Sequence, residues 1–430
     1  MTVDFKGHVG CVTDDSREAG PSCRFLATRL NERYAAEAKE RGAAFVTPAE
    51  LIDELGLRDL EVVGVTGTNG KTTTAAAIYS LLLDLGYKTA LQGTRGLFID
   101  DEKVEGKSLT TPPSLATIAH MAMARERGCE FFVMEVSSHA IDQNRIEGIG
   151  FSLKIHTNIT SDHLDYHGSI EAYRAVKSAF FQDESRKLVN RDEDILQFNP
   201  KNAYGYGIEN PATYKVMAYA LGGGVSGVLK HFEEVVPFET PLQGHFNLYN
   251  ITAAMAAVHL LTGEDLGDIA EAAENFAGVA GRMEKVSDDP LVIVDFAHTE
   301  DGIKQVLDSL KEKEIRVVLG AGGDRDATKR PKMGRAAAMV AKKVYLTSDN
   351  PRSEDPAVII EQMAEGIEEQ EKVVRIVDRK EAIRRALADL QEGEALLVLG
   401  KGDETWQEIG GKKIPFDDRE VIREILSRER

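Results

Sequence analysis

The sequence has no run of about eighteen or more apolar residues. It also lacks a basic N-terminal stretch followed by an apolar core, so neither a membrane span nor a secretory signal is expected. Positive charge is scarce, because 52 Lys and Arg stand against 71 Asp and Glu, a formal net charge of −19. Nucleic-acid surfaces need clustered cations, so this balance does not favour one. The composition predicts a cytoplasmic protein with no nucleic-acid partner.

Cysteine is also rare. Cys11, Cys23 and Cys129 lie at spacings that match no metal knuckle or paired redox motif, so all three are interpreted as structural in a reducing compartment. The 430 residues are 42% hydrophobic and 29% charged, which is typical of a globular chain with two to four domains. The absence of a heptad pattern or a long apolar stripe favours a monomer.

Apolar runs that alternate with helical patterns predict an α/β fold with mostly parallel sheets. The first series of expected strands comprises Leu60–Thr66, Phe131–Met134, Phe151–Ile155 and Lys187–Val189. The second comprises Leu291–Phe296, Ile315–Leu319, Val344–Thr347, Val373–Val377 and Ala395–Leu399, with helices at Lys332–Lys342 and Arg379–Leu390. Residues Asn202–Pro241, rich in Gly and aromatics, are expected to form irregular β excursions. The predicted domains are 1–60, 61–282 and 283–430.

A glycine-rich turn between an expected strand and helix predicts a phosphate-binding loop. Its residues are Gly67, Thr68, Asn69, Gly70, Lys71, Thr72 and Thr73. Lys71 can reach the β- and γ-phosphates of ATP, and the Thr72 hydroxyl can ligate Mg²⁺. The alternative is an ordinary glycine turn before a helix.

We expect a magnesium site at the sheet edge where the predicted strands have their carboxyl ends. Glu135 directly follows the run Phe131–Met134, and Asn158–Gly168 is dense in metal and phosphate ligands. In the helix that follows, Lys177 shares a stripe with Tyr173 and other apolar side chains and should face inward. An inward lysine can snorkel to the surface, or it can lose its proton and take up carbon dioxide to form a carbamate that ligates Mg²⁺.

Several motifs in order resemble the Mur ligases, most closely their muramoyl-tripeptide synthetases. They are TGTNGKTTT, MEVSSHAIDQNRI, TNITSDHLDYHG, LQGHFNLYN, GRMEKV, VDFAHT, GAGGDRDATKRPKMG, TSDNPRSEDP and GKGDE. The resemblance implies three domains: a small N-terminal UDP-binding domain, a central P-loop ATPase and a C-terminal Rossmann-like domain that binds the amino acid.

The resemblance also implies site roles. It places Lys71 and Lys329 on the nucleotide, Thr72 and Glu135 on one Mg²⁺, and His163 with carbamylated Lys177 on a second. The residues that complete the nucleotide site would be Asn247, Asn250, Arg282 and Asp295. For the UDP-muramoyl dipeptide the resemblance places Ser16 at the uridine, and the residues around the dipeptide would be Thr110, Thr111, Ser137, Gln143 and Arg145. Those for the amino acid would be Arg325, Asp349, Asn350, Pro351, Arg352, Gly400 and Glu404.

The implied reaction is ATP-dependent ligation of meso-diaminopimelate to UDP-N-acetylmuramoyl-L-alanyl-D-glutamate, through an acyl phosphate, in peptidoglycan precursor synthesis. Arg352 can fork onto a distal carboxylate, while Asp349 and Glu404 can accept from an ammonium. Lysine lacks that carboxylate. The alternatives are a lysine-adding relative, a folylpolyglutamate synthetase, and a nucleotide-dependent switch protein.

A cluster of cations is needed where anions meet in such a reaction. The run that supplies it consists of Arg325, Lys329, Arg330 and Lys332, unless these residues form a solvated basic turn.

Three positions depart from the family's usual pattern: Asp403 stands for a common His, Phe296 for a common Tyr, and Ala280 for a common Pro. The first of these bears on the diaminopimelate pocket.

Overall fold

The computed structural model describes residues 1–7, 9–310 and 313–428. Within these ranges, no helix combines the length and the apolar character needed to cross a membrane. The chain forms two compact units, which are described one at a time. The first comprises residues 1–220, 226–240 and 248–276, and the second comprises residues 221–225, 241–247 and those from 277 onward.

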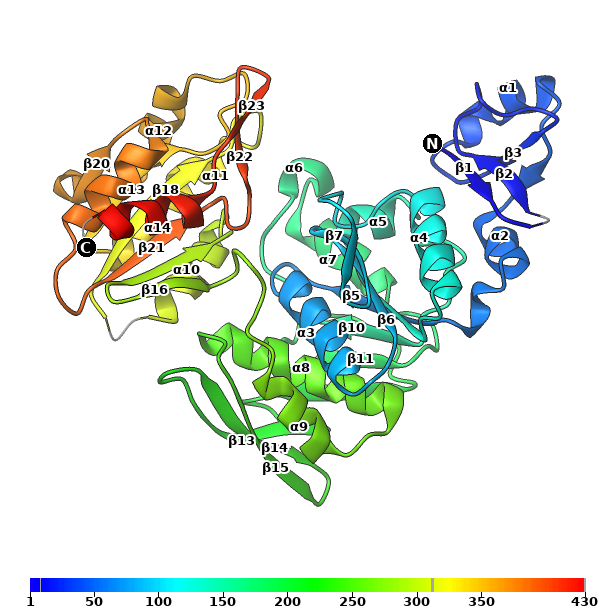
Figure 1. Cartoon of the computed structure of the whole chain (residues 1–430), viewed down its shortest axis with the longest axis horizontal. Coiled ribbons are helices and arrows are strands. Elements are labelled where there is room, and N and C mark those ends of the chain that lie inside the picture. Colours follow the sequence, from blue (N-terminus) through cyan, green and yellow to red (C-terminus); the bar gives the residue numbers. More distant parts are fainter. Residues whose placement is uncertain (8, 311–312, 429–430) are drawn as a thin grey trace. The chain divides into compact units, whose positions relative to one another are not determined.

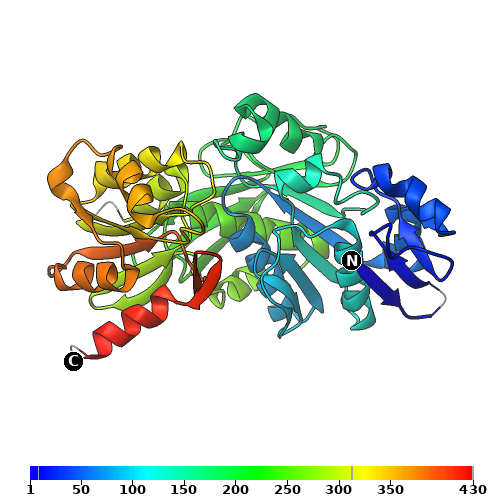
Figure 2. The same ribbon diagram turned by 90° about the horizontal axis from the view of Figure 1, so that it is seen from above.

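A four-stranded sheet begins the first unit (Figure 1). Its strands stand in the order β1-β2-β3-β4, and only the β1–β2 pair is antiparallel. The elements are β1 (Thr2–Phe5), β2 (Gly10–Thr13), β3 (Cys23–Leu26), η1 (Glu32–Tyr34), α1 (Ala35–Glu40), β4 (Phe45–Val46), α2 (Pro48–Glu54) and η2 (Leu57–Asp59). Phe5, Val12 and Leu26 pack into the same hydrophobic core as the central sheet, so this small sheet (dark blue in Figure 2) is anchored on it.

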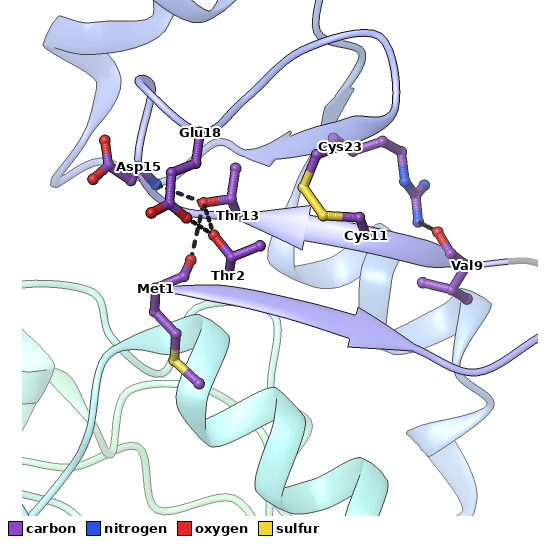
Figure 3. The surroundings of a disulfide bond; sticks show 9 residues. Met1, Thr2, Val9, Cys11, Thr13, Asp15, Glu18 and Cys23 are labelled. Atoms are coloured by element: carbon purple, nitrogen blue, oxygen red, sulfur yellow. Dashed lines mark hydrogen bonds between the residues drawn. A yellow bond between two sulfur atoms is a disulfide. The ribbon is translucent and has the colours of Figure 1, made fainter.

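A disulfide joins Cys11 of β2 to Cys23 of β3 (Figure 3). The two residues are register partners on neighbouring parallel strands, twelve positions apart in sequence. Cys129 is a buried free thiol. The interpretation of the cysteines as structural did not include this bond, and the bond departs from the expected reducing compartment. The reason is that strand register decides which cysteines meet, and their spacing in the chain does not reveal it.

The central sheet of the first unit has eleven strands, in the order β15-β14-β13-β12-β11-β10-β5-β9-β6-β7-β8. The strands from β13 to β6 are parallel to one another, and antiparallel strands extend the β6 edge. The strands are β5 (Glu61–Thr66), β6 (Thr89–Gly93), β7 (Gly96–Ile99), β8 (Glu102–Glu105), β9 (Phe131–Glu135), β10 (Leu153–His156), β11 (Lys187–Asn190), β12 (Ala203–Gly207), β13 (Tyr214–Ala220), β14 (Val225–His231) and β15 (Glu234–Thr240). The first predicted series of strands is confirmed as β5, β9, β10 and β11.

Helices flank this sheet. They are α3 (Lys71–Asp84), α4 (Ser114–Glu126), α5 (Ser138–Asp142), α6 (Leu164–His167), α7 (Ile170–Ala179), α8 (His245–Thr262) and α9 (Leu266–Glu274). Buried residues of α4 and α7 pack with Val62, Phe132 and Met134, alternate residues of β5 and β9, so these helices cover one face of the sheet.

The predicted β structure over Asn202–Pro241 is confirmed, but the expected irregularity is largely wrong, because these residues add four strands, β12 to β15, to the central sheet, with a register shift between Val216 and Ala218 of β13. The glycines that suggested irregularity serve close packing. A Cβ on Gly205 would lie 2.5 Å from Cγ of Arg191, and one on Gly207 would lie 3.1 Å from the Asp192 carboxylate. Glycine in a strand here marks the approach of a neighbouring side chain.

The second unit contains a six-stranded sheet in the order β16-β17-β21-β18-β19-β20, in which only β16 is antiparallel to its neighbour. The strands are β16 (Glu284–Asp288), β17 (Leu291–Asp295), β18 (Ile315–Ala321), β19 (Lys343–Ser348), β20 (Val373–Arg375), β21 (Ala395–Leu399), and a separate pair, β22 (Trp406–Ile409) and β23 (Lys412–Pro415). The helices are α10 (Glu300–Asp308), α11 (Lys329–Val340), α12 (Pro356–Ala364), η3 (Gln370–Lys372), α13 (Arg379–Ala388) and α14 (Asp418–Arg428). The second predicted series of strands and both predicted helices are confirmed.

A buried ion pair fixes the carboxyl end of β21. Arg379 donates to both carboxylate oxygens of Asp418, at 2.8 and 2.7 Å, and also to the carbonyl of Leu399 at 3.0 Å. Both charged side chains are fully buried, so removing one partner would leave the other charge uncompensated. The pair therefore holds α13, α14 and the end of β21 together.

Candidate active site

The predicted phosphate loop lies between β5 and the N-terminus of α3, where backbone N–H groups point at a ligand. Lys71 is the first residue of α3, and its Nζ donates to the carbonyl oxygens of Gly67 and Thr68, at 2.8 and 2.9 Å. Its ammonium therefore lies over the loop. Asn158, in the loop after β10, accepts from the backbone N–H of Asn69 at 2.9 Å and holds the loop from the side.

Two glycines of this loop stand where a side chain would collide. A Cβ on Gly67 would lie 1.8 Å from the hydroxyl of Thr157. Gly70 has φ +84°, and a Cβ there would lie 2.4 Å from Oδ1 of Asn250. The loop thus needs glycine at position 70 both for its left-handed backbone and for the approach of α8.

Glu135, the last residue of β9, connects the phosphate loop to the loop after β6. Its Oε2 accepts from the hydroxyl of Thr72 at 2.8 Å, and its Oε1 accepts from the backbone N–H of Thr94 at 2.9 Å. A Cβ on Gly93 would lie 2.1 Å from Oε1, so the carboxylate fills that space. A hydroxyl beside a carboxylate is an oxygen donor set that fits Mg²⁺.

The five residues expected around the muramoyl dipeptide are joined by hydrogen bonds next to Glu135. The Thr111 hydroxyl donates to the main-chain oxygen of Glu135 at 2.9 Å and accepts from the backbone N–H of Ser137 at 2.9 Å. Arg145 donates to the carbonyl of Thr111 at 2.8 Å and to the side chain of Gln143 at 2.9 Å. Thr110 joins through Thr94, with hydroxyls 3.0 Å apart. The structure therefore brings these five residues together, and their role in binding the dipeptide stays a prediction.

Lys177 faces inward, as predicted, and is 1% exposed. Its Nζ donates to the Gly67 carbonyl at 2.9 Å and to the Thr66 hydroxyl at 3.3 Å. Burial, with the nearby Lys71 ammonium, lowers the pKa of Lys177 well below its ordinary value. The alternative that its stem snorkels to the surface is wrong, because the ammonium ends next to the phosphate loop.

His163 lies at the N-terminus of α6 with φ +53°. Its Nε2 is 3.3 Å from a carboxylate oxygen of Asp162, and its ring centroid is 4.9 Å from that of His139. The structure thus places His163 beside His139 of α5, the helix that follows β9. Its pairing with Lys177 around one metal ion stays a prediction.

Two further groups were expected to bind nucleotide or uridine. Asn247 and Asn250 are both buried on α8, and Asn250 Oδ1 accepts from the Thr74 hydroxyl at 3.2 Å, beside the phosphate loop. Ser16 is also buried, and its hydroxyl donates to Glu37 of α1 at 2.7 Å. The uridine role of Ser16 stays a prediction.

In the second unit, the expected amino-acid residues gather at the carboxyl ends of β18, β19 and β21. A Cβ on Gly400 would lie 2.7 Å from Oδ2 of Asp349. Asn350 donates to the Glu404 carboxylate at 2.8 Å. Pro351 is adjacent too, because a Cβ on Gly323 would lie 2.0 Å from its carbonyl oxygen. The carboxyl end of a parallel sheet is where such folds bind ligands.

Arg352, with φ +51°, directs its guanidinium toward the β18 loop. It donates to the Gly323 carbonyl at 2.5 Å, and its Nε lies 3.5 Å from the Glu408 carboxylate. Arg325 lies next to it, because a Cβ on Gly322 would lie 3.7 Å from Cγ of Arg325 and 3.1 Å from Arg352. The two arginines therefore flank one glycine loop.

The expectation of four adjacent cations for anion binding is wrong for Arg330, which is 1% exposed. Its guanidinium donates to both oxygens of Glu354, at 2.7 and 2.8 Å, and to the Gly322 carbonyl at 3.0 Å. Hydrogen bonds from Arg330 hold the pKa of Glu354 at about 2. Arg330 therefore shapes the loop, and the exposed Arg325 and Lys332 remain on its surface.

Arg282 and Asp295 come together in the second unit around Phe296. The Arg282 guanidinium carbon lies 4.5 Å from the centroid of the Phe296 ring. Asp295 accepts from the backbone N–H groups of Met283 and Ala297, both at 2.7 Å. Burial raises the pKa of Asp295 despite these bonds and the Arg282 charge. Asp403, in place of the common His, lies close by, because a Cβ on Gly281 would be 2.0 Å from its nitrogen.

Sequence reasoning missed two residues that organise these sites. Thr94 bridges Glu135 and Thr110, and its one signal in the sequence is its place directly after Gly93. Lys401 is fully buried and donates to Glu404 at 2.9 Å and to Asn350 at 3.2 Å. Lys401 is the second residue of the GKGDE motif, and that position is a sequence signal that could have identified it.

Comparison with known proteins identifies two domains. Residues 65–258 match the Mur ligase middle domain, and residues 281–402 match the Mur ligase glutamate ligase domain. A curated protein from Wolinella succinogenes is 55% identical over 416 residues, with 96% of each chain covered. The chain belongs to the Mur ligase family. Membership makes it an ATP-dependent, ADP-forming amide ligase.

The Wolinella succinogenes relative is named UDP-N-acetylmuramoyl-L-alanyl-D-glutamate–2,6-diaminopimelate ligase. A protein of the same name from Helicobacter hepaticus is 51% identical over 413 residues, covering 94% of this chain and 89% of its own. A solved structure with this name has a TM-score of 0.69 at 31% identity, covering 97% of this chain and 94% of its own. Mycobacterium tuberculosis folylpolyglutamate synthase shares the fold alone, with a TM-score of 0.66 at 19% identity, covering 82% of this chain and 91% of its own.

Proposed function

We propose that this Mur ligase joins meso-diaminopimelate to UDP-N-acetylmuramoyl-L-alanyl-D-glutamate and converts ATP to ADP and phosphate. The observation that supports this most strongly is the double role of Glu135. Its carboxylate accepts from Thr72 of the phosphate loop, and its main-chain oxygen accepts from Thr111 of the dipeptide group. A reaction between a γ-phosphate and a dipeptide carboxylate needs those two substrates side by side.

In this proposal the dipeptide carboxylate attacks the γ-phosphate, which gives an acyl phosphate and releases ADP. The incoming amine then attacks the acyl carbon and displaces phosphate. Lys71 holds the phosphates, and Arg145 with its hydrogen-bonded neighbours orients the dipeptide. Oxygen donors from Thr72 and Glu135 fit one Mg²⁺, and His163 with carbamylated Lys177 would hold a second. When bound, these ions offset the charge repulsion between carboxylate and triphosphate.

The neutral amine that a carbamate requires is consistent with the lowered pKa of Lys177. The Lys177 Nζ donates to oxygen atoms of Thr66, at the end of β5, and of Gly67, in the phosphate loop. A carbamate there would add anionic oxygen donors near the nucleotide. The nucleotide roles of Asn247, Asn250, Lys329, Arg282 and Asp295 belong to the same proposal.

Diaminopimelate is proposed over lysine because of the loop that contains Arg352. Its guanidinium can form a charge-assisted, two-pronged hydrogen bond with the distal carboxylate, which lysine lacks. Asp349 and Glu404 lie at the same sheet edge to accept from the distal ammonium. In the structure Glu404 accepts from Lys401 and Asn350, so an ammonium would share that carboxylate.

The test is a ligation assay with purified protein, ATP, Mg²⁺ and the UDP-linked dipeptide, offered diaminopimelate, lysine or no amino acid. We expect phosphate release and a tripeptide product mass with diaminopimelate alone. Release with lysine but not diaminopimelate would overturn the substrate, and hydrolysis indifferent to any amino acid would favour the switch alternative. Folate with glutamate, offered in parallel, should give no product.

The predicted monomer is tested separately, by measuring the mass of the protein in solution by sedimentation.

A pair of variants sharpens the amino-acid assignment. Arg352→Lys keeps the charge and loses the planar fork, so KM for diaminopimelate should rise about tenfold or more. Arg375→Lys is the matched control, because Arg375 is an exposed arginine on β20. Equal kinetics for both variants would contradict the role of Arg352.

A further inference from the structure

Two histidines and a glutamate meet in the first unit, in a part of the chain that the proposed reaction does not use. His231 is the last residue of β14, Glu234 is the first of β15, and His259 lies in the last turn of α8. One potential ligand atom from each residue lies within 4.8 Å of the others. All three side chains are partly exposed, so an ion has access to them.

Tyr214 contacts both histidines of this cluster. It is buried at the start of β13, and it is the register partner of His231, on which its ring stacks at 4.5 Å and 7°. Its hydroxyl lies 2.6 Å from Nδ1 of His259. That bond commits one ring nitrogen of His259 and leaves Nε2 for a further ligand. Metal-binding histidines commonly use their second nitrogen in this way, which fixes both the tautomer and the orientation of the ring.

The turn between the two strands brings the ligands together. Only Phe232 and Glu233 separate His231 from Glu234, and Phe232 adopts φ +51°, which reverses the chain within two residues. The rings of His231 and His259 approach to 4.7 Å between centroids. Two strands and a helix, far apart in sequence, thus present three ligands at one place.

We propose that His231, Glu234 and His259 bind a divalent transition metal ion of the zinc class. Two imidazoles and one carboxylate suit zinc or its neighbours, whereas magnesium prefers oxygen donors alone. Ligand atoms around tetrahedral zinc stand about 3.3 Å apart. Since the three atoms already lie within 4.8 Å, small side-chain rotations would close the site, with water as the fourth ligand.

The ion would fasten the β14–β15 turn to α8. His259 lies nine positions after Asn250 on that helix, a distance of about 14 Å along its axis. Asn250 contacts the phosphate loop, so the metal would stiffen the helix that borders the nucleotide site without touching the substrates. The site is therefore structural, and it is independent of which amino acid the enzyme adds.

The competing interpretation is an aromatic stack of Tyr214, His231 and His259 with no metal. To decide, the full chain is stripped with a chelator, dialysed into millimolar Mg²⁺ and titrated with Co²⁺ and Zn²⁺. We expect one equivalent of zinc per chain, an absorption band typical of nitrogen- and oxygen-ligated cobalt, and a zinc-dependent rise in melting temperature. Absence of zinc binding would leave the stack interpretation and overturn the proposal.

Variants locate the ion. His231→Ala and Glu234→Gln should each weaken zinc affinity at least tenfold and abolish the zinc-dependent rise in melting temperature. Glu234→Gln keeps the shape of a partly exposed side chain, so it tests the ligand even if a histidine variant folds poorly. His298→Ala, at an exposed histidine of the second unit, is the control and should bind zinc like the wild type. Unchanged binding in the first two variants would show that zinc sits elsewhere and overturn the proposal.

Discussion

Lys71 and Lys177 donate hydrogen bonds to the same acceptor, the carbonyl oxygen of Gly67, at 2.8 and 2.9 Å. Two ammonium groups held this close repel each other, and burial penalises the charge on Lys177 further. The arrangement therefore favours a charged Lys71 on the phosphates and a neutral Lys177 behind them. This division of roles links the geometry of the phosphate loop to the proposed carbamate.

The first prediction concerns that carbamate. Lys177→Ala should lower kcat about 100-fold or more, because it removes electrostatic stabilisation next to the transferred phosphate. Added acetate or propionate should restore part of the activity by supplying the missing carboxylate. Lys154→Ala is the control, since Lys154 is another buried lysine whose Nζ donates to the Phe180 carbonyl at 2.8 Å. Rescue of both variants, or of neither, would contradict the carbamate.

The second prediction separates two effects of replacing a glycine, which are the collision of the new Cβ with a neighbouring side chain and the strain of a left-handed backbone. Gly70→Ala should raise KM for ATP at least tenfold, because the new Cβ would press on Asn250 and displace the phosphate loop. Gly86→Ala is matched to it, because Gly86 has φ +89° and a Cβ added there would meet no other heavy atom within 4 Å. That control should lose only about 1 kcal/mol of stability from its left-handed backbone and keep its KM. Similar KM values for the two variants would show that the contact with Asn250 is unimportant.

The third prediction concerns acid stability. Hydrogen bonds from Arg330 hold the pKa of Glu354 at about 2, below its ordinary 4.5. A carboxyl with a depressed folded-state pKa stabilises the protein above its ordinary value, and this contribution is lost as the pH falls from about 4.5 toward 2. At pH 7, Glu354→Gln should cost about 2 kcal/mol, the usual effect of losing hydrogen bonds between charged groups.

Denaturant titrations of wild type and variant at several pH values would measure this difference, which should shrink steadily below pH 4.5. Glu368→Gln, at an exposed glutamate, should show no such convergence. A gap that stays constant as the pH falls would mean that ionisation of Glu354 does not stabilise the fold.

The fourth prediction concerns the disulfide between Cys11 and Cys23. Closing so short a segment restricts the unfolded chain, and its loss should cost up to about 3 kcal/mol. A reductant should therefore lower the melting temperature of the wild type and leave that of the Cys11→Ser/Cys23→Ser variant unchanged. Cys129→Ser should retain the sensitivity to reductant, because Cys129 is not part of the bond. A reductant-insensitive wild type would show that the bond does not support stability.

Local patterns in the sequence predicted much of the fold and one buried catalytic candidate. The inward position of Lys177 follows from helical spacing alone, since the stripe with Tyr173 defines a buried face. The strand before the phosphate loop was equally visible, because β5 is a short apolar run followed by a glycine-rich turn.

What the sequence could not reveal depends on contacts between distant segments. Arg330 looked like a surface cation, and only its pairing with Glu354, 24 residues later, makes it structural. Cys11 and Cys23 meet through strand register. The glycines of β12 suggested irregular chain until Arg191 and Asp192 were seen to fill the space beside them.

The shared position of Glu135 has a consequence for inhibition. On the proposed assignment, a small molecule that captured this carboxylate would disturb the nucleotide loop through Thr72 and the dipeptide group through the adjoining backbone at once. A bacterium that escaped such a compound by replacing Glu135 would damage its own handling of both substrates. Resistance by that route would carry its own penalty in cell-wall synthesis.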